Sequence, residues 1–324
     1  MSENQNPEYP SSWADLARAG RQPATGPVPE ELRELFEGSA ARATRKTHRV
    51  PRTDRSITDD DSATDSQLPT WVEAAPRPRR SRRPAPPRVI HAGGTELDPL
   101  TIWAPDDRRT YNDHAFPWGL VCRIETAFGE RGSGVIIGPR HVLTASHCVE
   151  WSTDLAETIE VHRHGTGFRA RTHATFAMAF TQVDNPTVTT LDEDYAVLVT
   201  DQRIGDAFGF LGTKLYDSGW DDDHVWDTMG YASDIGGTVV PTFQQRVALD
   251  EDEFDLGSGR AMTTTADVKK MQSGSPMFGK FGDQTQVVAV ISAEGNVWFS
   301  GLENWCAGGS DLNRLVRQAR TDFP

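Results

Sequence analysis

The stretch Gly134-Val-Ile-Ile-Gly-Pro-Arg-His-Val-Leu-Thr-Ala-Ser-His-Cys148 joins two short apolar runs through a Gly-Pro turn and ends on a histidine among small residues. Apolar runs of about four residues, separated by turn residues, are typical of β-strands. His147 follows the second run directly, and the tight turn around it can hold its ring in one orientation. The stretch therefore predicts a pair of strands that presents an imidazole.

The same pattern of short apolar runs punctuated by Gly, Pro, Asp and Asn continues from about residue 115 onward. Strands at this spacing predict an all-β barrel or sandwich. One helix is expected, at residues 310–320, where Ser310 can cap the first turn and Leu312, Leu315 and Val316 share one face. The expected strands include residues 118–124, 134–137, 141–144, 158–163, 195–199, 224–230 and 285–292.

Two further motifs complete a possible catalytic set with His147. Asp194 opens the run Asp-Tyr-Ala-Val-Leu198, and Ser273 lies in Gln-Ser-Gly-Ser-Pro276. A hydroxyl is a poor nucleophile at neutral pH, and it needs an imidazole to accept its proton and a carboxylate to fix the imidazole tautomer. Each motif alone is more often structural, but the order His, Asp, Ser is one that this chemistry uses. We therefore expect His147 as the general base, Asp194 as the carboxylate that orients it and Ser273 as the nucleophile.

Two of these assignments have local competitors. Asp192 and Glu193 precede Asp194, which is preferred because the alternating run begins directly after it. Ser275 competes with Ser273, but the proline after Ser275 suits a tight exposed loop less well. The paired histidines of His162-Arg-His164 lack a nearby carboxylate or cysteine in a ligand pattern, so no metal site and no cofactor are expected.

Residues 1–92 differ from the rest of the chain. They hold 12 of the 20 prolines and 15 Lys and Arg against 13 Asp and Glu, so their net charge is +2 and the remainder carries −16. With so little apolar surface the segment is predicted to be mostly disordered. Its basic end, residues 77–88, reads as an extended linker, as a pro-segment that is cut away, or, least favoured beside an acidic body, as a nucleic-acid contact.

Nothing in the sequence suggests a membrane protein. Residues 1–30 lack the pattern of a signal peptide, and no stretch reaches the roughly 18–20 apolar residues of a membrane span. The three cysteines, at positions 122, 148 and 306, allow at most one disulfide. Sparse cysteines fit a reducing compartment and a secreted enzyme equally well.

From about Ile102 to the C-terminus, these motifs resemble the chymotrypsin-fold serine endopeptidases, and the bacterial glutamyl-endopeptidase-like enzymes in particular. The resemblance implies two perpendicular six-stranded barrels, at about residues 115–205 and 206–309 of a domain covering 93–324, with a site between them. It implies His147 as general base, Asp194 as its carboxylate and Ser273 as nucleophile. The backbone N–H groups of Met271 and Ser273 would form the oxyanion hole.

The chain departs from this family at two places. The family usually has glycine where Met271 stands, which suggests as an alternative a binding protein with impaired catalysis. Glutamate-selective members have a histidine where Ile291 stands, so glutamate specificity is not implied. The resemblance instead implies that Asp267 lies at the base of the substrate pocket. It implies that the wall of this pocket is formed by Ser292, Ala293 and Glu294. Two acids there would favour basic side chains, whereas in other relatives an Asp at the position of Asp267 only ties down the loop.

The resemblance also carries expectations about cysteines, partners and location. Relatives often bridge the position of Cys148 to that of Gly132, and Cys122 is the substitute partner here. We expect a Cys122–Cys148 disulfide if the protein is exported and free thiols otherwise. We further expect a monomer that acts on polypeptides and binds neither nucleic acid nor membrane. Relatives are extracellular, and a newly cut amino terminus within residues 89–102 could order the pocket. A second rival is an interaction protein that works through residues 1–92.

Overall fold

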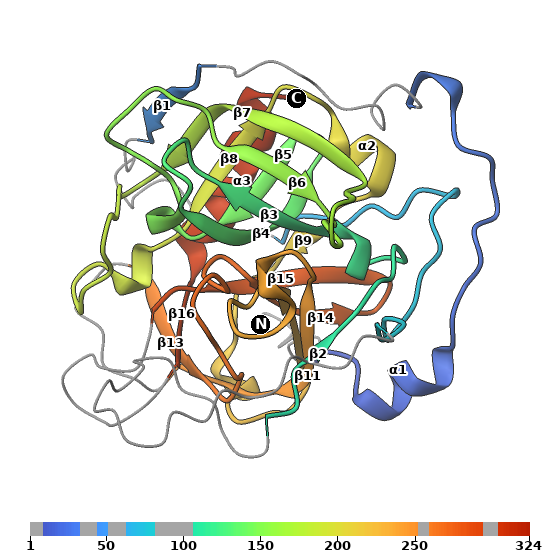
Figure 1. Ribbon diagram of the computed structural model, residues 1–324. Helices are drawn as coiled ribbons and strands as arrows, with labels where there is room; N and C mark the ends of the chain where they lie inside the picture. Colours follow the sequence, from blue (N-terminus) through green and yellow to red (C-terminus); the bar gives the residue numbers. More distant parts are fainter. Residues whose placement is uncertain (1–8, 33–43, 51–62, 82–105, 252–258, 294–303) are drawn as a thin grey trace, which may run out of the picture.

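The computed structural model describes residues 9–32, 44–50, 63–81, 106–251, 259–293 and 304–324. The strands of this part of the chain form two β-sheets. In Figure 1 the first, in green and yellow-green, lies above the second, in orange. The fold is chymotrypsin-like, as the sequence predicted.

The first sheet closes on itself into a six-stranded barrel. Its strands follow the order β7-β6-β3-β4-β5-β8, and β8 pairs back to β7. The turn at Gly138 and Pro139 joins β4 to β5 antiparallel, as the opening stretch of sequence predicted. The strands are β3 (Val121–Glu125), β4 (Arg131–Gly138), β5 (His141–Thr144), β6 (Thr158–Val161), β7 (Ala170–Ala179) and β8 (Ala196–Thr200).

The second sheet has nine strands in the order β12-β13-β16-β15-β14-β10-β11-β2, with β9 beside β15. No pairing among the described strands closes it, so it forms a half-barrel where a second six-stranded barrel was expected. In its core the rings of Tyr216, Trp220, Trp226 and Phe281 pack together edge-on or tilted, with ring centres 5.4–6.1 Å apart. The strands are β2 (Arg109–Thr110), β9 (Gly212–Thr213), β10 (Trp226–Gly230), β11 (Thr242–Val247), β12 (Leu249–Asp250), β13 (Arg260–Thr264), β14 (Pro276–Phe281), β15 (Gln284–Ile291) and β16 (Asn304–Gly308).

The chain ends in helix α3 (Ser310–Asp322), which returns to the first barrel and packs on β5, β7 and β8. Leu312, Leu315 and Val316 are fully buried there, as their shared face predicted. Ser310 is the first helical residue and not the cap, because Gly309 occupies the position before the helix. The two other helices are α1 (Trp13–Ala19) and α2 (Ile204–Phe208).

Three stretches of the segment predicted to be mostly disordered, residues 9–32, 44–50 and 63–81, lie on the folded body. β1 (Lys46–Arg49) adds to the first barrel as a parallel neighbour of β7. Just before it, Arg45 is 1% exposed and pairs with the buried Glu157 at 2.7 Å. The prediction of disorder rested on a shortage of apolar residues, but this stretch is held by strand pairing and a buried ion pair instead.

Residues 63–81 contact the second sheet and α2. Thr64 exchanges backbone hydrogen bonds with Thr213 of β9, and the indole of Trp71 donates to Ala207 O at 2.9 Å. Val72 and Ala75 are buried in the main apolar core. This stretch therefore supplies part of the core that a two-barrel domain would otherwise lack.

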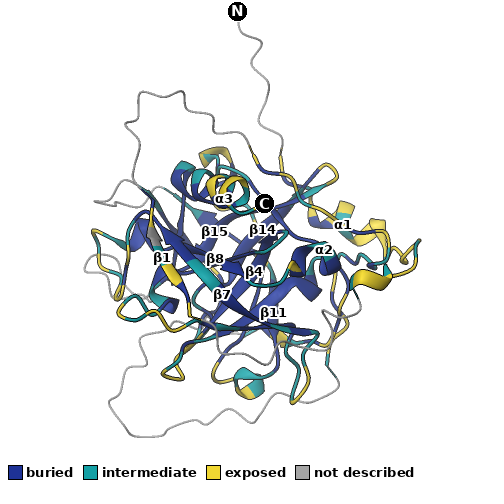
Figure 2. Cartoon of the chain, turned by 90° about the horizontal axis from the view of Figure 1, so that it is seen from above, coloured by how far each residue is buried: buried dark blue, intermediate teal, exposed yellow. Residues whose placement is uncertain are grey.

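The strands and the N-terminal helix α1 differ in how far they are buried. In Figure 2 most strand residues are dark blue, whereas β1 and α1 lie at the edge and carry exposed residues. Trp13 of α1 is the exception, with the guanidinium groups of Arg77 and Arg246 3.5 and 4.3 Å from its ring centre. Among the described residues, no helix has the length and apolar character needed to cross a membrane.

Candidate active site

His147 lies in a single 3₁₀ turn, Ser146–Cys148, directly after β5. Its ring Nδ1 is 2.6 Å from Asp194 Oδ2, and its backbone N–H donates to Asp194 Oδ1 at 2.9 Å. Two contacts to one carboxylate fix both the backbone and the ring. Nε2 is thereby left as the ring nitrogen that Asp194 does not engage.

Asp194 is completely buried at the start of the run that leads into β8. Besides His147, its Oδ2 accepts a hydrogen bond from Ser292 Oγ at 2.5 Å. The two competing acids face elsewhere: Asp192 accepts from Gly259 N at 2.5 Å, and Glu193 accepts from the Thr181 hydroxyl. Asp194 is therefore the acid that backs the imidazole.

The environment of His147 favours its protonated form. Burial opposes the positive charge, but the negative charge of Asp194, with a smaller effect of Cys148, more than offsets burial and raises the pKa of His147 well above its usual value. A ring with a raised pKa is a stronger proton acceptor once it is neutral.

Ser273 lies in the loop between β13 and β14, and we call residues 267–275 the Ser273 loop. Its carbonyl accepts from Ser133 N at 2.8 Å and from the thiol of Cys148 at 3.6 Å, which ties it to the barrel that carries His147. Its hydroxyl donates to Ser292 O at 3.4 Å. Ser292 thus contacts Ser273 through its carbonyl and Asp194 through its side chain.

The structure records no hydrogen bond between the described side chains of Ser273 and His147. Such contacts are often long before substrate binds and shorten in the complex. The competing hydroxyl of Ser275 is fully buried, without a hydrogen-bond partner in the described residues, against Gly230. Of the two serines, only Ser273 is partly exposed.

Glycine is required at position 274. Its φ is +82°, and a Cβ there would lie 2.2 Å from Ser133 O and 2.4 Å from the hydroxyl of Thr144. The Ser273 loop thus approaches the backbone of the first barrel more closely than any side chain allows.

Met271 occupies the place where the resemblance expected glycine. Its φ is +79°, a region that glycine enters freely and that costs other residues about 1 kcal/mol or more. Its carbonyl accepts from Ser133 Oγ at 2.8 Å. Among the described residues, nothing accepts from the backbone N–H of Met271 or of Ser273, so both are available to a ligand.

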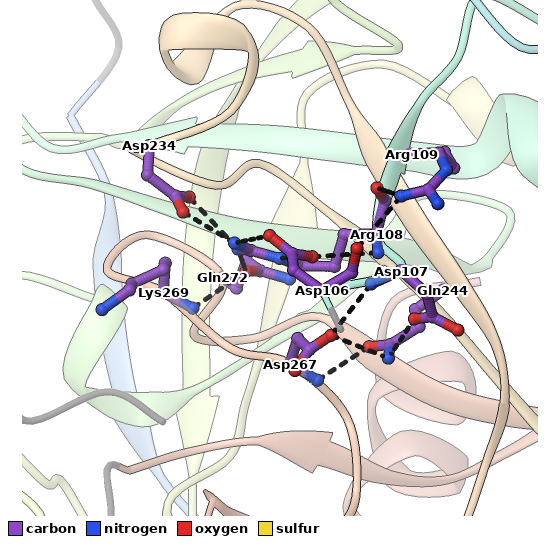
Figure 3. A network of polar contacts seen from close by, with 9 residues as sticks. All are labelled: Asp106, Asp107, Arg108, Arg109, Asp234, Gln244, Asp267, Lys269 and Gln272. Carbon is purple, nitrogen blue, oxygen red and sulfur yellow. Dashed lines mark hydrogen bonds and ion pairs between the residues drawn. The ribbon is translucent and has the colours of Figure 1, made fainter. Parts of the chain in front are cut away.

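The residues expected to line the substrate pocket have different surroundings. Asp267 is 2% exposed, and its Oδ2 accepts from Asp107 N at 3.3 Å and Gln244 Nε2 at 3.2 Å (Figure 3). Ser292 backs Asp194, a role that the sequence analysis missed because a serine at a strand end carries no local signal. Ala293 accepts from Trp305 N, and Glu294 lies outside the described residues.

All three cysteines are free thiols. The free thiols agree with the expectation for a protein that is not exported, and the Cys122–Cys148 bridge expected for an exported protein is not formed, because the two sulfurs have different neighbours. Cys122 Sγ lies in the barrel core near Leu120 O, whereas Cys148 Sγ faces Ser273 O and would touch a Cβ at Gly132 at 2.5 Å. Position 132 is thus next to Cys148 in space, as the resemblance implied, but it carries no sulfur.

The histidines of the His162-Arg-His164 motif do not form a metal site with their neighbours. His162 is 1% exposed and packs edge-on against Tyr111 and His114. Within the part of the chain that the structure describes, no group of three or more His, Cys, Asp or Glu is arranged to hold a metal ion.

Comparison with known proteins gives consistent matches. The family model described as Trypsin matches residues 106–297. A protein named extracellular metalloprotease, from Bacillus subtilis (strain 168), is 22% identical over 227 residues, which are 64% of this chain and 69% of that protein. A solved structure of a Glu endopeptidase in complex with MPD superposes with a TM-score of 0.54 at 19% identity, covering 66% of this chain and 96% of the other.

Proposed function

Because this chain belongs to the trypsin family of serine proteases, we propose that it cleaves polypeptides with Ser273 as nucleophile, His147 as general base and Asp194 as the carboxylate that orients the ring. The observation that carries this proposal is the pair of contacts from Asp194 to His147, at 2.6 and 2.9 Å. A carboxylate on Nδ1 selects the tautomer whose Nε2 accepts a proton.

The reaction follows from this arrangement. Ser273 Oγ attacks the peptide carbonyl carbon while His147 Nε2 accepts the hydroxyl proton. The tetrahedral intermediate then expels the amine, which takes that proton from His147, and an ester on Ser273 remains. Water attacks the ester with His147 again as base, which releases the acid and restores Ser273.

The N–H groups of Met271 and Ser273 are proposed to stabilise the oxyanion. Support comes from their freedom from other acceptors among the described residues and from the left-handed conformation of Met271. Donors placed where negative charge develops contribute about 10²–10³ in rate each. A backbone N–H donates equally well from methionine and glycine, so the substitution alone does not remove the donor.

Charge selection by Asp267 gains no support from its surroundings. Its carboxylate already accepts from Asp107 N and Gln244, and it is almost completely buried. We therefore propose that Asp267 stabilises the Ser273 loop, and we drop the preference for basic side chains that it suggested.

A fluorophosphonate probe tests the proposal. The probe should label the wild-type protein at Ser273, located by peptide mass spectrometry, and should not label Ser273→Ala. Ser275→Ala is the matched control and should label like the wild type, because its hydroxyl is buried. Peptide hydrolysis should be found in the wild type and in Ser275→Ala, which are labelled, and should be lost in Ser273→Ala.

The rival is a protease-fold binding protein with impaired catalysis. A folded wild-type protein that takes up no probe and hydrolyses no peptide would support it and overturn the proposal. If Met271→Gly then restored labelling, the cause would be the methionine at the oxyanion hole.

A further inference from the structure

Arg108 holds a buried guanidinium beside the Ser273 loop. Its side chain has no exposed surface, although it directly precedes the edge strand β2. Burying a charge is costly unless partners satisfy it. Here Asp234 and Asp106 pair with Nη2 at 2.6 and 3.1 Å, and Gln272 Oε1 accepts from Nη1 at 2.9 Å (Figure 3).

Gln272 connects this guanidinium to the proposed nucleophile. It is the residue immediately before Ser273 and is 2% exposed. Its Oε1 accepts from Lys269 N at 2.9 Å as well as from Arg108. One amide oxygen therefore fixes the loop internally and also joins it to the chain before β2.

The other end of the Ser273 loop is held by a neighbour of Arg108. Asp107 N donates to Asp267 Oδ2 at 3.3 Å, and Asp107 Oδ1 accepts from Gln244 Nε2 at 2.5 Å. Gln244 in turn accepts from Asp267 N at 2.7 Å. Residues 106–108 thus contact both ends of the loop (Figure 3).

The loop needs this support because its backbone is unusual. Met271 and Gly274 both have positive φ, at +79° and +82°. Strained backbone persists only where the surrounding contacts over-determine it. Ser133 of the first barrel contacts Met271 and Ser273, and Arg108 contacts Gln272, the residue between them.

We infer that Arg108 is a positioning residue: through Gln272, its buried guanidinium holds residues 271–273 in the conformation that leaves the N–H groups of Met271 and Ser273 free for the substrate oxygen. This inference rests on the proposed function. The cation is part of the continuous chain, so the loop reaches its working conformation without a newly cut amino terminus from residues 89–102.

The charge state of Arg108 supports this role. Burial opposes the charge, but the hydrogen bonds to Asp106 and Asp234 raise its pKa above the ordinary value. Arg108 therefore stays cationic at every pH at which His147 works.

The test compares variants of the full chain whose intact mass shows that residue 1 is still present. Arg108→Met and Gln272→Met should each lower kcat by about 10²–10³-fold, the effect of losing one oxyanion donor, with KM changed less than about 3-fold. Arg108→Lys keeps the charge and should recover part of kcat. Arg109→Met is the matched control, since the hydrogen bonds of that exposed neighbour within the described residues go to backbone oxygens, and its kcat should equal that of the wild type.

The outcomes separate the two proposals. If the wild type is neither labelled by the fluorophosphonate nor active, the proposed function fails. If the wild type is active and Gln272→Met is folded with unchanged kcat, the inference about Arg108 is overturned, even if Arg108→Met does not fold. If intact chains stay unlabelled while chains cut within residues 89–102 are labelled, the independence from processing is overturned.

Discussion

Two opposing influences act on the imidazole of His147. Burial disfavours its charge, while Asp194 and Cys148 favour it and together raise its pKa well above 6.5. Proton acceptance from Ser273 needs the neutral ring, so kcat/KM should rise with pH and reach half its maximum above pH 6.5. The measurement is a pH profile of peptide hydrolysis by the wild type.

A variant tests whether Asp194 is the cause of the raised pKa of His147. Asp194→Asn removes the main stabiliser of the protonated ring, so its residual activity should reach half-maximum at a lower pH than that of the wild type. A wild-type midpoint at or below 6.5 would contradict the assignment of His147 as a base backed by Asp194.

Gly274 is the position where the backbone tolerates least change. Gly274→Ala would place a Cβ 2.2 Å from Ser133 O at a φ of +82°, so the loop must move and labelling of Ser273 should fall at least about 10-fold. Gly129→Ala is the control, because Gly129 has a similar φ of +86° with nothing within 4 Å. It should lower stability by about 1–2 kcal/mol and leave the labelling rate unchanged. Equal labelling rates in both variants would contradict the close approach.

Local motifs predicted His147, Asp194 and Ser273 because each stands beside a strand with its own short signature. The contacts that join them to their supports were not predictable in this way. Ser292 is 98 residues from Asp194, and Gln272 is 164 residues from Arg108. A serine at a strand end and an arginine before a short edge strand look like ordinary surface residues until the fold brings their partners to them.

Among the elements, the short strand β1 is preceded by an arginine that forms a buried ion pair with Glu157. Glu157 is fully buried, and burial raises its pKa even beside Arg45. Arg45→Met would leave this carboxyl group without its cation, so the free energy of unfolding should fall by about 3–5 kcal/mol. Urea denaturation of the full chain measures it.

The matched control for Arg45 is another arginine of the same N-terminal segment. Arg18 pairs with Asp15 on α1, and both side chains are exposed. Arg18→Met should give no measurable change, because exposed ion pairs contribute little. An Arg45→Met protein as stable as Arg18→Met would mean that residues 44–50 are not needed for the barrel. Composition could not predict this role, since the residue that needs Arg45 lies in the loop before β6.

At the scale of the whole molecule, buried histidines limit stability in acid. Burial lowers the pKa of His141 to about 4 and that of His162 well below its usual 6.5. Between pH 6.5 and 4 these two histidines therefore bind more protons in the unfolded chain than in the folded one. The free energy of unfolding should fall with pH over this window, by up to about 1.4 kcal/mol per pH unit for each of the two.

His147 does not cancel this loss. Its raised pKa adds stability that is fully present below pH 6.5 and is lost only as pH rises through the folded pKa. Urea denaturation at pH 7 and pH 5 checks the expectation. A free energy of unfolding that is equal at both pH values would contradict the role of the two buried histidines.

The placement of residues 63–81 bears on how the protein is made. Ser66 N donates to Gln284 Oε1, a partner 218 residues further along the chain. A ribosome that adds about 5–20 residues per second needs roughly 10–40 s to supply that partner. This contact of residues 63–81 therefore forms long after the segment itself has been synthesised. The contacts of residues 63–81 with β15 therefore form only after the whole first barrel has been synthesised.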